Sequence, residues 1–371
     1  MALAGVCAEE AIGRSDPNPR VGCVLLSADG RLISTGSTQK AGEAHAEVMA
    51  LRAARSAGAP LKCATAYVTL EPCSHHGRTP PCCDALVEAG IARVVVAVQD
   101  PNPQVNGRGI ERLRQAGMEV QVLPPAAPAA VAARELNIGF FSRMQRGRPW
   151  VRMKIAASLD GRTALPNGVS QWITGEAARR DGHLWRKRAG AILTGIGTVK
   201  ADDPRLDVRL VPTEVQPVRV VVDSRLEISP GARVLQPPGR CLVYTAVPPQ
   251  KSTAAGEASR ATVLGPNAQV IQIASTAATP TAAKTDLAAV MADLGARGIN
   301  EVHVEAGEKL NGSLLEAGLV DELLVYLAPM LLGSGASMAS LRERFKPAEG
   351  IAFVLSACQP IDGDLRLILR C

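Results

Sequence analysis

A histidine, a glutamate and two cysteines of the chain combine the types and spacing that zinc-dependent hydrolysis requires. His45 and Glu47 are separated by one residue, and Cys73 is followed by the adjacent pair Cys82 and Cys83. One histidine and two cysteines are the donor set of a catalytic Zn²⁺ site, which keeps a fourth position open for water. Bound zinc lowers the pKa of that water, and Glu47 is placed to carry a proton from it to a leaving amine. The pattern predicts hydrolytic deamination.

The spacing of the cysteines leaves two alternatives open. The usual deaminase signature places two residues between its cysteines, whereas eight residues separate Cys73 from Cys82 here. Side chains of Cys82 and Cys83 would differ by about 100° around a helix, so only one of them should face the metal. A structural zinc site would instead close with a fourth protein ligand, for which Cys83, His75 and His76 are candidates.

The elements around these residues are expected to alternate between strands and helices. Apolar runs predict strands at 21–27, 64–70, 92–98 and 118–123, and helical spacing with flanking Pro or Gly predicts helices at 44–58, 80–90 and 107–117. Such alternation is typical of a parallel sheet with helices on its faces. The histidine and both cysteine positions fall where strands and helices meet, which is where such sheets bind ligands.

A second domain is predicted from the Pro/Ala-rich stretch 124–133, the helical stretch after it and the break at 147–149. We place the first domain at residues 1–146 and the second at residues 147–371. The second opens with a strand at 150–161 and again alternates strands with helices. Residues 246–285 are rich in Ala, Thr, Ser and Pro and are expected to form a variable surface excursion.

Composition excludes several classes of protein. The net charge is +6, basic and acidic residues nearly balance in residues 1–145, and Tyr67 is the only aromatic residue before Phe140. A single-strand nucleic-acid binder needs a basic groove with several aromatic rings, so we expect no nucleic-acid partner. No apolar run reaches 18 residues, which predicts no membrane partner. With no basic, cleavable leader and nine irregularly spaced cysteines, we expect reduced thiols and a cytoplasmic location.

The second domain shows signs of a nucleotide cofactor, although no Rossmann fingerprint follows any strand. Gly195 and Gly197 end a predicted strand but lack the third glycine of that motif. Glycines also precede the helix predicted near 308–315, and a helix N-terminus favours phosphate. Most of the positive charge lies in this domain, which suits an anionic cofactor and an anionic substrate.

Longer blocks of the sequence resemble the RibD family of bifunctional riboflavin biosynthesis enzymes. PNPRVGCV (17–24), AGEAHAEVMAL (41–51) and TLEPCSHHGRTPPC (69–82) resemble the deaminase half of that family. KIAASLDGRTA (154–164), SQWIT (170–174), ILTGIGTVKADDPRLDVR (192–209) and VEAGEKLNGSLL (304–315) resemble its reductase half. The resemblance implies an N-terminal cytidine-deaminase-like α/β/α domain and a C-terminal dihydrofolate-reductase-like α/β domain. The long spacer between the cysteines is similar to that of the family.

This resemblance implies two successive reactions on a small pyrimidine phosphate. The first is zinc-dependent deamination of 2,5-diamino-6-ribosylamino-4(3H)-pyrimidinone 5′-phosphate. The second is reduction of the ribosyl chain by NADPH to give 5-amino-6-ribitylamino-uracil phosphate. Family members are commonly multimeric, so a homo-oligomer is expected. The implied deaminase residues are the zinc ligands His45, Cys73 and Cys82, the catalytic Glu47, Asn18 at the pyrimidine edge, and His75, His76 and Arg78 as candidates for the phosphate or ribose.

The same resemblance implies the reductase residues. The NADPH-binding positions are Ala156, Trp172, Thr198, Asp202, Ser224, Gly307, Glu308, Lys309, Leu310, Asn311, Gly312 and Ser313. The substrate-binding positions are Ser170, Arg186, Leu206, Arg209 and Glu305. Arg186 and Arg209 are chemically suited to a phosphate, which arginine pairs with bidentately. For Lys154 and Asp160 a structural pairing and a catalytic role remain open, and Trp172 is either a cofactor contact or a core anchor.

A nucleic-acid-editing deaminase with an accessory binding domain is the alternative function. That function needs a basic, aromatic groove beside the zinc site. The near-neutral first domain with its single early aromatic residue argues against it.

Overall fold

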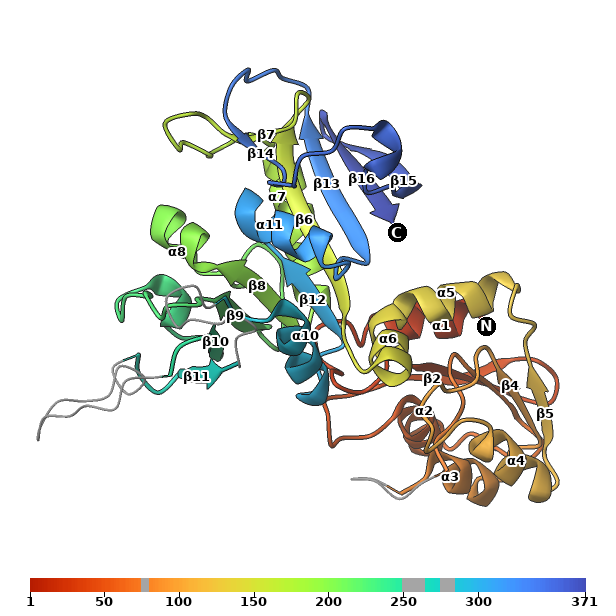
Figure 1. Ribbon diagram of the computed structural model, residues 1–371. Coiled ribbons are helices and arrows are strands. Elements are labelled where there is room, and N and C mark those ends of the chain that lie inside the picture. The colour runs from red at the N-terminus through yellow and green to blue at the C-terminus, as the bar shows by residue number, and fades with distance from the viewer. Residues whose placement is uncertain (75–79, 249–263, 274–283) are drawn as a thin grey trace, which may run out of the picture. The chain divides into compact units, whose positions relative to one another are not determined.

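The computed structural model describes residues 1–74, 80–248, 264–273 and 284–371. The chain divides into two compact units, Met1–Gly147 and Arg148–Cys371 (Figure 1). No helix in the described ranges is long and apolar enough to cross a membrane.

The first unit is built on a five-stranded sheet in the order β2-β1-β3-β4-β5. Its strands are β1 (Gly22–Leu26), β2 (Leu32–Ser37), β3 (Thr65–Val68), β4 (Arg93–Val96) and β5 (Glu119–Val122). The expected parallel arrangement holds for β3, β4 and β5. It is wrong for β1, which pairs antiparallel with both β2 and β3. Asp29-Gly30 is a hairpin turn signal after β1, but the range of β2 was not predicted, because most of its residues are exposed or half-buried and give no apolar run.

Six helices accompany this sheet in the described part of the first unit. They are α1 (Ala2–Glu9), α2 (Ala46–Ser56), α3 (Cys82–Glu88), α4 (Arg108–Gln115), α5 (Pro128–Leu136) and α6 (Ile138–Arg146). Helices α2, α3 and α4 lie inside the predicted ranges. Gly36 lets strand β2 lie directly against the first turn of α2, because a Cβ there would come 2.3 Å from the carbonyl oxygen of Ala46. This contact fixes the helix that begins next to His45.

The second unit contains a nine-stranded sheet in the order β11-β10-β9-β8-β12-β6-β13-β16-β15. Its strands are β6 (Trp150–Ser158), β8 (Ala191–Gly195), β9 (Val218–Val222), β10 (Cys241–Thr245), β11 (Ala268–Gln272), β12 (Glu301–Val304), β13 (Glu322–Ala328), β15 (Val354–Ile361) and β16 (Asp364–Arg370), with β7 (Arg162–Ala164) and β14 (Ala336–Ser337) in a separate pair. Neighbours are parallel from β11 to β13, and the last two strands are antiparallel. The excursion predicted at 246–285 is wrong in part, since β11 joins the sheet there; residues 249–263 and 274–283 lie outside the described residues.

Helices α7 (Glu176–Arg188), α8 (Ile196–Asp202), α10 (Leu287–Ala296) and α11 (Glu308–Glu316) complete this unit. Apolar residues of β6, β8, β12 and α10 form the main core. Helix α7 instead packs against a charged patch of the sheet. Arg152 of β6 forms ion pairs with Glu322 and, at 2.8 Å, with Glu301. The guanidinium of Arg152 also lies 4.4 Å from the ring centre of Trp185, which belongs to α7. All three charged side chains are buried, so these contacts fix the position of α7, which carries Arg186.

Candidate functional site

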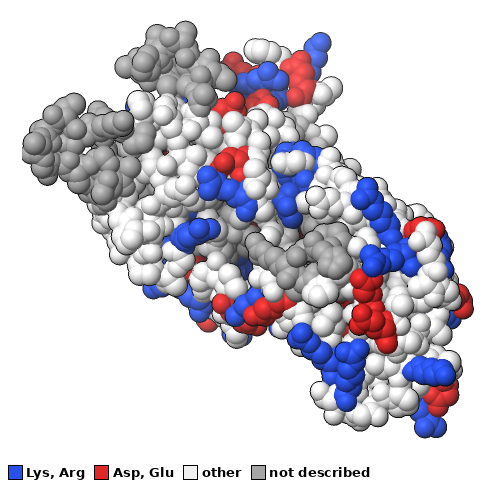
Figure 2. Space-filling model, turned by 90° about the horizontal axis from the view of Figure 1, so that it is seen from below, with Lys and Arg blue, Asp and Glu red and all other residues white. Residues whose placement is uncertain are grey.

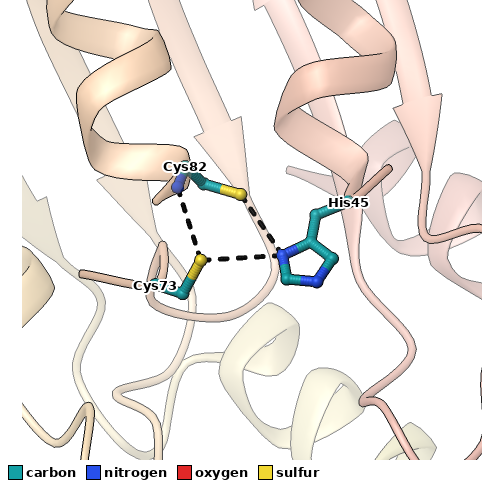
Figure 3. Close-up of side chains that lie close together, drawn as sticks. All are labelled: His45, Cys73 and Cys82. Atoms are coloured by element: carbon teal, nitrogen blue, oxygen red, sulfur yellow. Dashed lines mark hydrogen bonds between the residues drawn. The ribbon is translucent and has the colours of Figure 1, made fainter. Parts of the chain in front are cut away.

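The predicted zinc ligands lie together in the first unit (Figure 3). His45 is the residue just before α2, Cys73 lies in the loop that follows β3, and Cys82 is the first residue of α3. The Nδ1 atom of His45 lies 3.6 Å from the Sγ atom of Cys73 and 3.3 Å from that of Cys82. Their donor atoms all lie within 4.8 Å of one another. One imidazole and two sulfurs at this spacing match the donor set of a zinc ion.

The structure distinguishes between the two adjacent cysteines. The thiol of Cys83 donates to the carbonyl oxygens of Pro72 at 3.3 Å and Gly109 at 3.5 Å. Cys83 is fully buried in the apolar core, and this burial raises the pKa of its thiol. It is therefore packed as a small apolar residue, and within the described residues the donor cluster contains His45, Cys73 and Cys82. His75, His76 and Arg78 lie outside the described residues.

The electrostatics of the cluster favour a metal cation. The pKa of Cys73 is lowered to about 4, because the Cys82 thiol donates to its sulfur and His45 and the Cys82 backbone N–H add further hydrogen bonds. A thiolate is the form that binds zinc. Glu47 lies in the first turn of α2 and is only 3% exposed. Burial, together with the negative charge of Cys73, raises the pKa of Glu47 to about 7, so its carboxyl is poised to take up or release a proton near neutral pH.

Glu71 is a functional residue that the sequence reasoning missed. Its buried carboxylate accepts backbone N–H groups from Asp100 at 3.1 Å, Gly107 at 2.9 Å, Gly109 at 2.9 Å and Ile110 at 3.3 Å. These donors belong to the loop before α4 and to its first turn, where a negative charge is stabilising. Glu71 therefore ties the segment that contains Cys73 to α4.

We expect Glu71→Gln to lower the free energy of unfolding by about 2–4 kcal/mol, because an amide NH₂ would face backbone N–H groups that need an acceptor. Urea denaturation measures this loss, and zinc analysis should show less metal per chain. Glu111→Gln is the matched control, since Glu111 lies exposed on α4 and, among the residues that the structure describes, its carboxylate accepts from Gln115 alone. Equal midpoints for the two variants would show that Glu71 does not hold this loop.

The second unit contains a cavity of about 560 Å³ that gathers many of the predicted reductase residues. The predicted residues that line it are Trp172, Arg186, Thr198, Asp202, Leu206, Arg209 and Glu305. Lys154, His183 and Arg205 line it as well. Several cationic side chains therefore face one cavity, which suits an anionic ligand.

The centre of this cavity is an arginine–carboxylate pair. Arg186 donates to both oxygens of Glu305, at 2.5 Å and 2.8 Å, and the ring of His303 lies 3.3 Å from the same carboxylate. Although burial alone would raise it, the charge and hydrogen bonds of Arg186 hold the pKa of Glu305 well below its usual range. Burial lowers the pKa of Lys154, the nearby amine on β6. A fixed anion and a half-buried amine thus lie close to each other at the cavity.

Other predicted residues stand at the edge of this cavity or apart from it. Ser170 donates a hydrogen bond to Asp202. Ser224 follows β9 and pairs with Thr285 at 3.0 Å. Ala156 is a half-buried residue of β6. In the first unit, Asn18 closes a turn through its backbone N–H to Ser15. The roles implied for these residues remain predictions.

The glycine-containing segment at the start of α11 divides into two parts. Thr198 accepts the backbone N–H of Gly307 at 3.1 Å, which places the helix start beside the cavity. The next amides, those of Glu308, Lys309 and Leu310, belong to the first turn of the helix, where backbone N–H groups have no intrahelical acceptor. The later positions face elsewhere: Asn311 is buried and donates to Met338, and a Cβ at Gly312 would come 1.8 Å from the Ser340 carbonyl.

Asp160 and Trp172 have different surroundings in the structure. Asp160 accepts the backbone N–H groups of Leu332 at 3.1 Å and Gly333 at 2.7 Å, which is a structural pairing. Trp172 is 65% exposed, so it is not a core anchor. Its ring lies at the cavity with the guanidinium of Arg179 4.4 Å from its centre.

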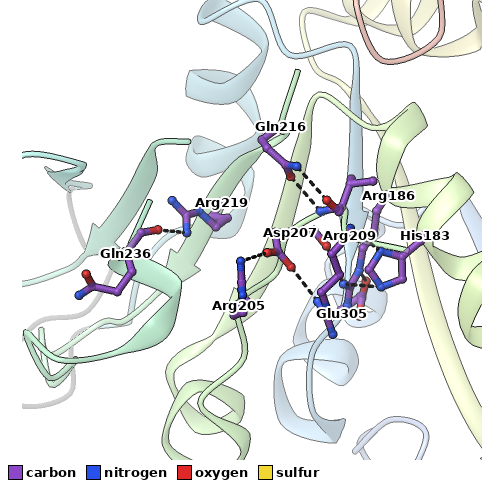
Figure 4. A network of polar contacts seen from close by, with 10 residues as sticks. His183, Arg186, Arg205, Asp207, Arg209, Gln216, Arg219, Gln236 and Glu305 are labelled. Carbon is purple, nitrogen blue, oxygen red and sulfur yellow. Dashed lines mark hydrogen bonds and ion pairs between the residues drawn. The ribbon is translucent and has the colours of Figure 1, made fainter. Parts of the chain in front are cut away.

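Asp207 is the second functional residue that the sequence reasoning missed. It is 3% exposed, yet its carboxylate binds Arg205 and Arg209 (Figure 4). The sequence gives no periodic signal for this role, because Leu206 has a φ of 50° and interrupts any regular extended alternation between Arg205 and Arg209.

Comparison with known proteins covers both units. The family model of the RibD C-terminal domain matches residues 149–364, and that of the cytidine and deoxycytidylate deaminase zinc-binding region matches residues 1–98. The riboflavin biosynthesis protein RibD of Escherichia coli (strain K12) is 48% identical over 366 residues, covering 95% of this chain and 93% of the relative. The RibD of Aquifex aeolicus is 40% identical, covering 93% and 90%.

The chain belongs to the RibD family. Among solved structures, Acinetobacter baumannii RibD is 39% identical with a TM-score of 0.85, covering 100% of this chain and 97% of that one. A diaminohydroxyphosphoribosylaminopyrimidine deaminase/5-amino-6-(5-phosphoribosylamino)uracil reductase from Thermotoga maritima is 32% identical with a TM-score of 0.84 and the same coverage.

RibD membership explains why one chain holds two different sites. The chain is a bifunctional enzyme of riboflavin biosynthesis, with a zinc-binding deaminase domain and an NADPH-using reductase domain. The deaminase match at residues 1–98 includes His45, Glu47, Cys73 and Cys82, and the RibD C-terminal match includes the cavity. The expected cytidine-deaminase-like and reductase folds are confirmed, and a second domain of the reductase family disfavours the nucleic-acid deaminase alternative.

Proposed function

We propose that the first unit hydrolyses the amine of 2,5-diamino-6-ribosylamino-4(3H)-pyrimidinone 5′-phosphate. The second unit then reduces the ribosyl chain of the product to give 5-amino-6-ribitylamino-uracil phosphate. The observation that carries this proposal is the three-donor cluster of His45, Cys73 and Cys82 with the buried Glu47 beside it. Three protein donors are the number found in catalytic zinc sites, which leaves a coordination position for water.

The deaminase residues have distinct tasks. Zinc, when held by His45, Cys73 and Cys82, supplies Lewis acidity that makes water a stronger nucleophile at neutral pH. The Glu47 carboxylate accepts a hydrogen bond from Cys82 and is influenced by the charges of Cys73 and His45, so its proton is close to the reacting groups. Its carboxylate takes a proton from the attacking water, and the resulting acid gives a proton to the departing amine. Glu71 keeps Cys73 in place throughout.

The reductase residues bind and align their ligands. NADPH supplies the hydride when bound. We propose that Arg186 and Arg209 bind the anionic substrate, with Glu305 fixing the guanidinium of Arg186 against the sheet. The free N–H groups at the start of α11 bind a cofactor phosphate. Trp172 and its partner Arg179 cover the cavity and exclude water from the sugar carbon that is reduced.

We propose that the protein forms a homo-oligomer through the edge strand β15. Most of its side chains are exposed, including Val354 at 71% and Leu355 at 56%. A long exposed apolar edge is a ready site for pairing with a second chain. Light scattering of the purified protein should give a mass that is a multiple of 38.8 kDa, and Val354→Lys should lower it.

We further propose that the protein acts in the cytoplasm on small molecules and not on nucleic acid. All nine cysteines are free, as expected for a reducing compartment. Basic and acidic side chains are interspersed on the face seen in Figure 2, so that face has no uniform positive field.

The proposal is tested by a coupled assay of the purified protein with the diaminopyrimidine phosphate. Without NADPH we expect ammonia release alone, and with NADPH we expect stoichiometric cofactor oxidation as well. NADPH oxidation without prior ammonia release would contradict the proposed order. Failure to release ammonia from zinc-loaded protein would refute the deaminase assignment.

A further inference from the structure

One buried residue in the second unit, Asp207, contacts three arginines at the cavity, two through its carboxylate and one through its backbone carbonyl (Figure 4). The Oδ2 atom of Asp207 lies 2.7 Å from Nη2 of Arg205, and its Oδ1 atom lies 2.7 Å from Nη1 of Arg209. The backbone carbonyl of Asp207 accepts Nη1 of Arg186 at 2.9 Å. Although burial alone would raise it, the hydrogen bond and charge of Arg209 and the charge of Arg205 hold the pKa of Asp207 below its usual value, so it is ionised near neutral pH.

Arg205 and Arg209 keep donors available for a ligand. Their side chains are 44% and 46% exposed, and both line the cavity. A guanidinium has five N–H donors, and the ion pair with Asp207 engages one terminal nitrogen of each. One negative charge between two positive charges leaves a net positive charge on the cluster. A net positive charge and unengaged guanidinium donors at one cavity suit a phosphate monoester.

The segment that carries the cluster is held in place from both sides. Gln216 accepts the backbone N–H of Val208 and donates to its carbonyl oxygen, both at 2.8 Å. On the other side, the ring of His183 accepts the backbone N–H of Arg209 at 3.2 Å. Burial and two neighbouring arginines lower the pKa of His183 to about 4, so the ring is neutral and can act as an acceptor. The arginines therefore start from a fixed backbone.

We propose that Arg205 and Arg209 form a preset clamp for the phosphate monoester of the reductase substrate, and that Asp207 is the positioning residue that holds both guanidiniums. Of these two arginines, the sequence reasoning assigned only Arg209 to the substrate, so Arg205 is a further binding residue. This inference rests on the proposed reductase function, because it names the part of the substrate that the cavity recognises.

The Asp207→Asn variant separates orientation from net charge. If only charge matters, removing a carboxylate from an anion site should make phosphate bind more tightly. If Asp207 orients the arginines, its loss should weaken phosphate binding, because flexible guanidiniums must be ordered again for each ligand. We expect the second result, a rise of roughly three- to tenfold in the inhibition constant of inorganic phosphate and in the KM for the substrate.

Arg205→Gln tests the clamp without touching the buried carboxylate. We expect about a tenfold rise in the substrate KM and in the phosphate inhibition constant, with the KM for NADPH unchanged. Arg233→Gln is the charge-matched control, since Arg233 lines the same cavity without contacting Asp207 in the described residues. Its effect should stay within about twofold. The unchanged KM for NADPH reports that the second unit is folded in these variants.

Other results of these measurements would contradict the clamp or its assignment to the substrate. Tighter phosphate binding by Asp207→Asn, or an unchanged substrate KM in Arg205→Gln, would overturn the clamp. A raised KM for NADPH but not for NADH in Arg205→Gln would assign the clamp to a cofactor phosphate and refute the substrate assignment. If the wild-type chain does not reduce the substrate, the proposed function fails, whereas the clamp is still judged by how phosphate raises the melting temperature of each variant.

Discussion

Glu47→Gln is expected to lower the deaminase kcat by at least about a thousandfold while zinc stays bound. The amide keeps the size of the side chain but cannot take a proton from water or return one to the leaving amine. Glu47 lies two residues after His45 but is not one of the three clustered donor residues, so the zinc ion should stay bound. Ammonia release measures the activity, and metal analysis measures the zinc.

The reductase activity of the same preparation is the internal control for Glu47→Gln. It should be unchanged when the deaminated intermediate is supplied directly, because the cavity belongs to the other unit. Retention of more than about a tenth of the deaminase activity would mean that another group moves the proton.

Cys82→Ser and Cys83→Ser should differ sharply although the residues are adjacent. We expect Cys82→Ser to lose zinc and deaminase activity, because it removes one of only two sulfur donors from the described cluster. Cys83→Ser should keep both, with a loss of about 1 kcal/mol in the free energy of unfolding, since its thiol meets only carbonyl oxygens in the core.

The measurement is zinc per chain together with ammonia release for both variants after equal exposure to added zinc. Retention of full zinc and activity in Cys82→Ser, with loss of both in Cys83→Ser, would reverse the assignment of the third ligand.

Local signals explain which elements could be predicted from the sequence. Strands β3 and β4 lie within apolar runs, and Pro81, Gly58 and Gly90 flank α2 and α3, so pattern alone locates these elements. Strand β2 and strand β11 are mostly exposed or half-buried and carry Ser, Thr, Gly or Gln, so they form only because a neighbouring strand supplies hydrogen bonds. Their existence depends on partners that the sequence pattern does not reveal.

The residues of the candidate sites also differ in whether the sequence alone could predict their roles. The zinc donors could be predicted because their chemistry depends on residue type and spacing. The choice between Cys82 and Cys83 could not, because it depends on how α3 rotates against the core. Glu71 and Asp207 were missed because their roles come from buried backbone amides or arginines, and a carboxylate in a loop gives no periodic signal.

The most direct test of the account is X-ray absorption spectroscopy at the zinc edge on the purified, active protein. The account predicts one zinc per chain with two sulfur donors at about 2.3 Å and two lighter donors near 2.0–2.1 Å, one from His45 and one from solvent. A shell completed by a fourth protein donor, seen as a third sulfur or a second imidazole, or the absence of zinc from protein that still deaminates, would contradict it.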